Sequence, residues 1–373
     1  MFEPVLIVAR SGRQLAEAAR AGGYEPLVVD FFGDLDTAVA CRTNIVLRPR
    51  SNLGFDAVSL LDALHRIRTH HGPMPLVWGS GFESQPHLLA ALAQTWTIKG
   101  CTVNTLFAVN DPRRFNHTLT AMQLRPPQLA SGEVPPNGQW LVKPRGSCGG
   151  FGVSTPGARR FTGQREYFQV KRTGVHLSAA LMAAPRTVSV LGVCEALNLQ
   201  PQAGQPYRFS GAIAAPVWFK RLRNELTQIA EKLHTAFTLR GLCGIDFVVD
   251  SSGRIALIEL NARPTATFDL LAQPDRVFQA HMDADTQPYG LLAKHGQVRA
   301  MAVCYAEHPI TVSKTLNWPS WVADRPQVGT RLATGMPACT ISAAALTLQD
   351  TRRILESRFE KLINQLRTHE CTR

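Results

Sequence analysis

The order of apolar and polar positions predicts a doubly wound α/β unit at the start of this chain. The apolar run 4–9 suits one strand, a helical period then leads to the glycine pair 22–23, and a second apolar strand ends at Asp30. An amphipathic stretch at 59–71 and the apolar run 75–78 continue the alternation. This order builds a parallel sheet, and the loop RSGR after the first strand lacks the GxGxxG spacing of dinucleotide sites.

Glu83 stands in a glycine turn, GSGFE, shortly after the run 75–78. Open α/β sheets bind ligands at the carboxyl ends of their strands, so this carboxylate is a candidate for holding a substrate amine. An acid at the start of the next helix, stabilised by the helix dipole, is the structural alternative. The sequence leaves both interpretations open.

A second informative stretch, QWLVKPRGSCGGFGV, joins a strand at 140–142 to Lys143 and a glycine-rich loop. Lys143 and the loop together form a candidate phosphate clamp. The glycines let backbone N–H groups approach anionic oxygens, and the ammonium group of Lys143 adds a point charge. The loop residues concerned are Gly146, Ser147, Gly149, Gly150 and Gly152. The spacing is not that of a P-loop, and a mobile turn is the alternative.

The extended segment Gln169, Val170 and Lys171 follows, at a point where the chain is expected to pass between two lobes. One backbone N–H and one C=O of this segment are candidates for binding an adenine edge, with the side chains of Gln169 and Lys171 nearby. An ordinary strand with a polar outer face is the alternative.

The stretch GLCGIDFVVDSSGRIALIELNAR, at 241–263, predicts two strands joined by a turn. Each strand contains an acid, Asp246 or Glu259, and an unpaired buried carboxylate is costly. Asn261 lies two residues after Glu259 and so faces the same side of an extended chain. These three oxygen donors suit Mg²⁺, and Arg263 follows on the same side. A solvent-facing hairpin with ordinary ion pairs is the alternative.

The remaining third of the chain predicts a mixed lobe. Apolar strands are expected at about 298–306 and 339–348, and an amphipathic helix at about 350–366 closes the chain. At 373 residues, with 45% hydrophobic and 18% charged content, the chain is long enough for two or three globular domains.

The net charge and the spacing of the cysteines limit the kinds of partner and cofactor that are expected. The formal net charge is +12, but the basic residues are spread along the chain, which favours anionic small molecules over nucleic acid. The eight cysteines show no CxxC or zinc-type spacing, which is typical of reduced thiols. No apolar run approaches a membrane span or a signal-peptide core, so a cytoplasmic protein without a membrane partner is expected.

Taken in order, these motifs resemble the ATP-grasp superfamily over about 107–273. The resemblance implies α/β and α+β architecture: an N-terminal Rossmann-like pre-ATP-grasp domain at 1–106, an ATP-grasp domain at 107–273 with a lid lobe at about 139–190, and a C-terminal lobe at 274–373. ATP would lie between two lobes. Lys143 and the glycine loop would contact its phosphates, and the segment 169–171 its adenine. Asp246, Glu259 and Asn261 would carry Mg²⁺, or Mn²⁺, and Arg263 would meet the transferred phosphoryl group.

The phrases RSGR, VVDFFGDLDT, GSGFE and ELNARPT look more specifically like the ATP-dependent carboligases predicted for tetrahydromethanopterin-linked one-carbon pathways, and the last also like tyramine–glutamate ligases. Three positions depart from that pattern. Ala262 replaces a proline, Arg113 or Arg114 stands where a first phosphate-binding lysine is usual, and Lys171 replaces an acid at the adenine segment.

This resemblance implies a carboxylate–amine ligase that forms an acyl phosphate from ATP and serves the biosynthesis of a C1 cofactor of methanofuran or methanopterin type. Glutamate is the expected acid or amine substrate, and a homo-oligomer or a one-carbon enzyme complex is the expected assembly. A carboxylase that activates bicarbonate and a non-catalytic ATP-binding partner of a one-carbon complex are the alternatives.

Overall fold

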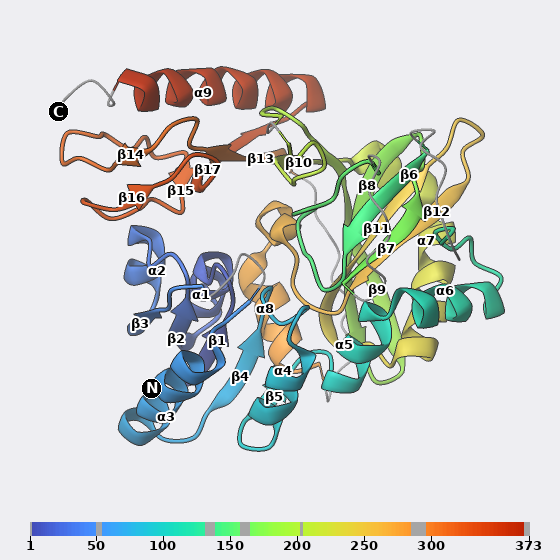
Figure 1. The fold of residues 1–373 in the computed structure, drawn as a ribbon, viewed down its shortest axis with the longest axis horizontal. Helices are drawn as coiled ribbons and strands as arrows, with labels where there is room; N and C mark the ends of the chain where they lie inside the picture. The colour runs from blue at the N-terminus through green and yellow to red at the C-terminus, as the bar shows by residue number, and fades with distance from the viewer. Residues whose placement is uncertain are drawn as a thin grey trace.

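The computed structural model describes residues 2–49, 54–130, 139–156, 165–201, 204–284 and 296–368. Two sheets organise this part of the chain, one parallel and near the N-terminus, the other antiparallel and built from later residues (Figure 1). None of the helices within these ranges has the length and apolar character needed to cross a membrane.

The N-terminal sheet is parallel and has the strand order β3-β2-β1-β4-β5. Its elements, in chain order, are β1 Glu3–Val8, α1 Arg13–Ala21, β2 Tyr24–Asp30, α2 Leu35–Ala40, β3 Thr43–Val46, α3 Ala57–His71, β4 Pro75–Trp78, α4 Pro86–Ala93 and β5 Thr97–Lys99. The predicted doubly wound α/β unit is therefore confirmed.

Two short helices lead from this sheet to the rest of the molecule. They are α5, Val103–Asn110, and α6, Pro112–Ala121. Asp111 caps α6, since its side chain accepts from the N–H groups of Arg113 and Arg114 at 2.9 and 3.1 Å.

The larger sheet has the order β12-β11-β8-β9-β10-β13-β17-β15, and a separate pair joins β6 to β7. The elements are β6 Trp140–Pro144, β7 Glu166–Val170, β8 Val175–Ala184, β9 Thr187–Ala196, β10 Gly211–Ala214, α7 Pro216–Phe237, β11 Gly241–Val249, β12 Ile255–Asn261, η1 Ala266–Leu270, α8 Pro274–Met282, β13 Val298–Tyr305, β14 Ile310–Thr311, β15 Val322–Ala323, β16 Arg331–Leu332, β17 Pro337–Ala345 and α9 Leu348–Thr368.

Two features of this part differ from a simple division of the sequence. The polar and apolar periodicity of the sequence predicts a helix over 225–237, but helix α7 begins earlier, at Pro216. Proline fits the first turn of a helix, where its missing N–H costs nothing. The hydrogen-bonded sheet also runs from β10 into β13, so it crosses the predicted boundary between residues 273 and 274. The domain limits themselves stay predictions.

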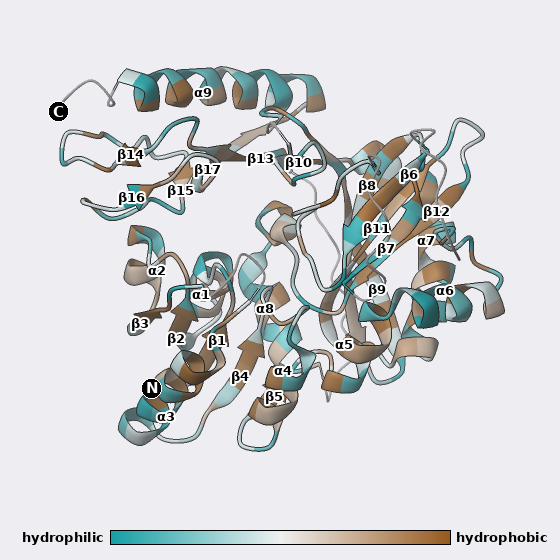
Figure 2. Ribbon diagram, in the orientation of Figure 1, coloured by the Kyte–Doolittle hydropathy of each residue, from teal (hydrophilic) through white to brown (hydrophobic). Residues whose placement is uncertain are grey.

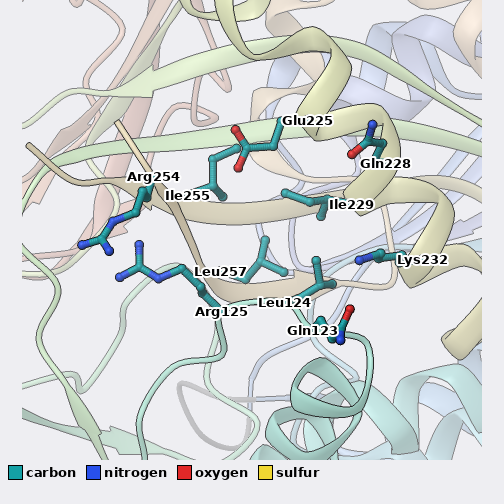
Figure 3. A pocket seen from close by; sticks show the side chains of 10 residues that line it. All are labelled: Gln123, Leu124, Arg125, Glu225, Gln228, Ile229, Lys232, Arg254, Ile255 and Leu257. Atoms are coloured by element: carbon teal, nitrogen blue, oxygen red, sulfur yellow. The ribbon is translucent and has the colours of Figure 1, made fainter. Parts of the chain in front are cut away.

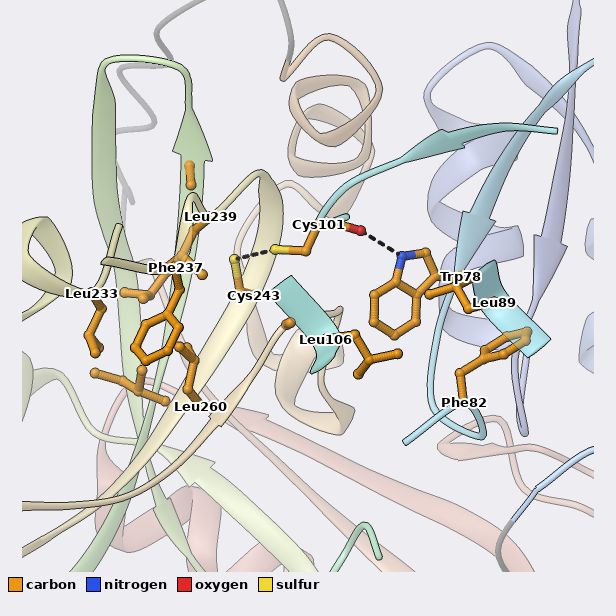
Figure 4. Close-up of a cluster of buried hydrophobic side chains, with 14 of the residues drawn as sticks. Trp78, Phe82, Leu89, Cys101, Leu106, Leu233, Phe237, Leu239, Cys243 and Leu260 are labelled. Atoms are coloured by element: carbon orange, nitrogen blue, oxygen red, sulfur yellow. Dashed lines mark hydrogen bonds between the residues drawn. The ribbon is translucent and has the colours of Figure 1, made fainter. Parts of the chain in front are cut away.

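The core joins the two sheets. The brown, apolar strands lie inside, and the exposed faces of the outer helices are teal (Figure 2). Between the sheets, Trp78 and Leu106 belong to the same buried cluster as Phe237 (Figure 4). In this cluster the sulfur atoms of Cys101 and Cys243 lie 3.8 Å apart, as free thiols. All seven cysteines in the described ranges are free of disulfide bonds, and their reduced state stays a prediction.

A buried arginine fastens α1 to two distant segments. The Arg13 side chain is only 4% exposed, and its guanidinium contacts Asp269 at 2.5 Å and Asp324 at 2.9 Å. Burial alone would lower the pKa of Arg13, but the two carboxylates raise it by more. The pKa of Arg13 therefore lies above its ordinary value. Residues from the first helix, from η1 and from the C-terminal part of the chain are thus held by one cation.

Replacing this cation should destabilise the fold strongly. We expect Arg13→Met to lower the free energy of unfolding by roughly 3 kcal/mol, because Asp269 and Asp324 lose their common counter-charge. The matched control is Arg66→Met, which removes an exposed pair with Asp62 on α3 and should cost less than about 1 kcal/mol. Urea unfolding of both variants measures the difference, and equal losses would contradict this role of Arg13.

Candidate active site

The hairpin of β11 and β12 brings two carboxylates face to face. Asp246 and Glu259 are direct cross-strand partners, so their side chains leave the same face of the sheet. Two residues further along both strands, Asn261 pairs with Gly244. The Nδ2 of Asn261 donates to Asp246 Oδ2 at 2.9 Å. Burial, together with repulsion from Glu259, raises the pKa of Asp246 to about 7. The three predicted metal-binding side chains therefore lie together.

Lys143, in β6, reaches this pair of acids from the smaller sheet. Its Nζ lies 3.9 Å from Glu259 Oε2 and donates to Gln169 Oε1 at 3.4 Å. Burial lowers the pKa of Lys143, but the interactions of its ammonium with Tyr167 and Glu259 outweigh burial and raise that pKa overall. A cation is thus held between the expected phosphate loop and the expected metal ligands.

Arg263 is buried against Glu83, which comes from the N-terminal sheet. Its Nε donates to Glu83 Oε1 at 2.5 Å, and both side chains are 8% exposed. The other oxygen of Glu83 accepts from the N–H of Gly81 at 2.6 Å, and Arg263 also donates to Asn261 Oδ1 at 3.2 Å. Burial lowers the pKa of Arg263, but Glu83 raises it more. The structure gives Glu83 a cationic partner that neither sequence interpretation named.

The glycine loop, which follows Lys143, packs against two other segments of the backbone. The N–H of Phe209 donates to the carbonyl of Gly149 at 2.9 Å. A Cβ on Gly150 would stand 1.9 Å from the carbonyl oxygen of Tyr207, and one on Gly146 would stand 2.5 Å from the Cα of Ser84. The loop therefore approaches two backbone segments at distances that only glycine permits, each with a positive φ.

The residues expected to hold adenine are more buried, and their backbone N–H groups more fully paired, than the sequence suggested. Gln169 is only 2% exposed. The N–H of Val170 donates to the carbonyl of Gln128 at 2.9 Å, and that of Lys171 to the carbonyl of Gln139 at 2.7 Å. Both donors thus have protein partners in this structure, and an adenine contact here would use a carbonyl or the side chain of Gln169.

Tyr167 lies near Lys143 and was not among the residues predicted from the sequence. The Tyr167 ring lies 5.8 Å from Lys143 Nζ and 5.9 Å from the guanidinium carbon of Arg145. Tyr167 is two residues before Gln169 in β7, so the alternation of a strand placed both on one face. By contrast, Arg113 and Arg114 are exposed on the first turn of α6.

The donor set fits a hard divalent cation. Within the described ranges, His, Cys, Asp and Glu side chains alone form no group of three or more that could hold a metal ion. The hairpin instead offers two carboxylates and one amide, and Mg²⁺ is usually bound by one or two carboxylates together with phosphate oxygens. A cation between Asp246 and Glu259 would also relieve the repulsion that raises the pKa of Asp246.

Comparison with known proteins supports the same fold. Residues 109–267 match the family model of the ATP-grasp domain. No curated protein sequence matches the chain. N5-carboxyaminoimidazole synthetase from Staphylococcus aureus, solved with ADP, is similar over 96% of this chain and 97% of its own, at 12% identity and a TM-score of 0.68.

Two further solved structures are similar. L-amino acid ligase from Bacillus licheniformis matches over 97% of both chains, at 14% identity and a TM-score of 0.70. The biotin carboxylase domain of 2-oxoglutarate carboxylase from Hydrogenobacter thermophilus, solved with MgADP, ADP and bicarbonate, matches over 95% of this chain and 89% of its own, at 12% identity and a TM-score of 0.72. The chain therefore has the ATP-grasp fold, as the sequence predicted.

The buried pair of Glu83 and Arg263 can be tested by a double-mutant cycle. Glu83→Gln and Arg263→Met should each lower the free energy of unfolding by roughly 3 kcal/mol, because each leaves a buried charge without a partner. The double variant should lose much less than the sum, with a coupling energy of roughly 2 kcal/mol. Urea unfolding gives all four values.

An exposed pair provides the comparison. The same cycle on Arg367 and Glu307, whose side chains are 54% and 31% exposed, should give a coupling below about 1 kcal/mol. Additive losses at Glu83 and Arg263 would show that the two side chains do not stabilise the fold as a pair.

Proposed function

We propose that this protein is an ATP-dependent ligase that joins a carboxylate to an amine through an acyl phosphate and releases ADP and phosphate. The observation that carries the proposal is the cluster of Asp246, Glu259 and Asn261 near Lys143, which is followed by the glycine loop, in a fold shared with a solved amino acid ligase. Glutamate as a substrate, a role in C1-cofactor biosynthesis, a cytoplasmic location and a place in a one-carbon enzyme complex belong to this proposal as its finer part.

The chemistry needs ATP because a free carboxylate has no leaving group that an amine can displace. Attack of a carboxylate oxygen on the γ-phosphorus forms an acyl phosphate and releases ADP. The amine nitrogen then attacks the acyl carbon, phosphate leaves, and the nitrogen loses a proton. No protein nucleophile takes part, so the task of the protein is to position the reactants and to neutralise charge.

Each side chain of the cluster has a part in that task. Lys143 neutralises the nucleotide phosphates, and the glycine loop supplies N–H donors and excludes water. Asp246, Glu259 and Asn261 would hold Mg²⁺, or Mn²⁺ in its place, and the bound ion would neutralise phosphate charge. Arg263, oriented by Glu83, stabilises the transferred phosphoryl group. Gln169 lines the nucleotide side next to Lys143.

A second candidate function is a carboxylase that activates bicarbonate. Two of the similar structures are a carboxyaminoimidazole synthetase and a carboxylase domain solved with bicarbonate, which favours this candidate. Bicarbonate would then take the place of the organic carboxylate and form carboxyphosphate. ADP release that requires bicarbonate, and no other acid, would replace the first proposal by the second.

A third candidate is a non-catalytic ATP-binding partner. Arg113 and Lys171, which depart from the family pattern, favour it. Calorimetry that shows ATP binding without ADP release across a panel of acids, amines and bicarbonate would support this candidate against both enzymes.

Removing one charge of the carboxylate pair should abolish turnover. With ATP, Mg²⁺ and an accepted pair of substrates, Glu259→Gln should lower kcat at least about 100-fold, because phosphate charge is no longer neutralised in the transition state. Circular dichroism should show an unchanged fold. Glu356→Gln, at an exposed position of α9, is the matched control and should keep the rate of the parent. An active Glu259→Gln would remove the metal assignment.

The glycine loop offers a matched pair of variants. Gly149 and Gly150 have φ of 61° and 69°, so alanine is strained equally at both. Only at Gly150 would the new Cβ meet a backbone oxygen at 1.9 Å; at Gly149 the nearest atom is 3.9 Å away. We therefore expect Gly150→Ala to raise the KM for ATP and lower kcat by about tenfold more than Gly149→Ala. Equal effects would show that loop closure against Tyr207 is unimportant.

A further inference from the structure

Two cavities lie away from the cluster of the candidate active site. One has a volume of about 270 Å³ and is lined by Arg125, Lys232, Arg254 and Glu225 among others (Figure 3). The second, of about 380 Å³, is lined by Asn116, Arg125, Pro126, Gln128, Leu129 and Arg172. Arg125 lines both, so the two cavities adjoin at this side chain.

Arg172, which lines the second cavity, has an unsatisfied donor in its guanidinium. The Nε of Arg172 is inaccessible to solvent and has no hydrogen-bond partner, whereas its Nη2 donates to the carbonyl of Pro126 at 3.4 Å. A buried guanidinium N–H without an acceptor costs free energy, so Arg172 is incompletely paired within the protein. Anionic oxygens are the strongest acceptors for the other donors of a guanidinium.

The cavity walls also carry an excess of positive charge. Arg125 and Arg254 share one carboxylate, Asp250, at 3.0 and 3.3 Å. Lys232 donates to the carbonyl of Met122 at 2.9 Å, so its charge is not neutralised by that contact. Apart from Glu225, the charged side chains that line the two cavities are cationic. This charge balance attracts an anion.

We propose that the second cavity binds a phosphate group, either free or carried by a small ester, between Arg172 and Arg125. The planar guanidinium presents parallel N–H donors that match phosphate oxygens, and the polar residues Asn116 and Gln128 also line the cavity. The site is separate from the cluster around Lys143, since the residues that line this cavity and those that form the cluster do not overlap.

Occupancy of this cavity should act on the nucleotide segment, and this step rests on the proposed function. The carbonyl of Gln128 accepts from the N–H of Val170 at 2.9 Å, and Leu129 forms a β-bridge with Gln169. Arg172 follows Lys171 directly. A phosphate held by Arg172 and the 125–129 segment would therefore fix the strand that is expected to meet adenine. Because coupling is reciprocal, phosphate and ADP should each tighten the binding of the other.

Calorimetric titration tests the site directly. At constant ionic strength set with chloride, inorganic phosphate should bind the wild-type chain saturably. Arg172→Gln and Arg125→Gln should each weaken its affinity at least tenfold. Arg353→Gln, which alters an exposed arginine of α9, should leave the affinity unchanged. A second titration uses glycerol phosphate in place of inorganic phosphate. The compound that binds more tightly shows whether the cavity prefers a phosphate ester or free phosphate.

A variant of the candidate active site separates the two phosphate positions. Lys143→Met should leave phosphate affinity unchanged, because Lys143 does not line the cavity. Absence of saturable binding, or loss in Lys143→Met with none in Arg172→Gln, would overturn the proposal.

The coupling has its own measurement. ADP affinity should rise in saturating phosphate for the wild-type chain and stay unchanged in Arg172→Gln. If phosphate binds but ADP does not, the proposed function fails and the cavity stands. If both bind with no mutual effect, the coupling is overturned.

Discussion

The repulsion between Asp246 and Glu259 is the constraint on which the candidate site depends. The hairpin register holds the two carboxylates opposite each other, and the pKa of Asp246 rises to about 7 because burial and its neighbour both oppose ionisation. Both acids are ionised together at neutral pH only when positive charge lies close by. Lys143 supplies it at 3.9 Å from Glu259, and a phosphate-bound divalent cation would supply the rest.

The positive charges come from different parts of the chain, so the site exists only when those parts are docked. Lys143 belongs to the smaller sheet, and Arg263 follows the hairpin but is held by Glu83 from the N-terminal unit. Arg13 adds a second such fastening, between α1 and the carboxylates of Asp269 and Asp324. The N-terminal unit is thus more than a scaffold, because it fixes the orientation of an arginine in the site.

Sequence patterns predicted what local spacing determines. The turn residues in 241–263 are sufficient to predict the hairpin, and alternation places Glu259 and Asn261 on one face. The register shift between Asp246 and Phe247, which sets Asp246 opposite Glu259, could not be predicted from this spacing. Contacts that depend on docking could not be predicted in this way. The pair Glu83–Arg263 joins residues 180 positions apart, and no local signal specifies it.

The adenine segment shows the same limit more sharply. Its extended character was readable from the sequence, but the availability of its N–H groups was not, because Gln128 and Gln139 reach it from the preceding connection. That connection contains prolines and no periodic pattern, so nothing in it predicted pairing with β7. The partners of a backbone donor are decided by which segment lies beside it.

The folded position of the glycine loop follows from close approach rather than from strong bonding. The bond from Phe209 N–H to the Gly149 carbonyl contributes about 1 kcal/mol, and the cation–π contact of Arg208 with Phe151, at 5.8 Å, contributes about as much. Each of these interactions is small compared with the free energy of unfolding of a typical domain. The glycine at position 150 therefore matters mainly because it permits an approach to Tyr207 at a distance closed to other residues.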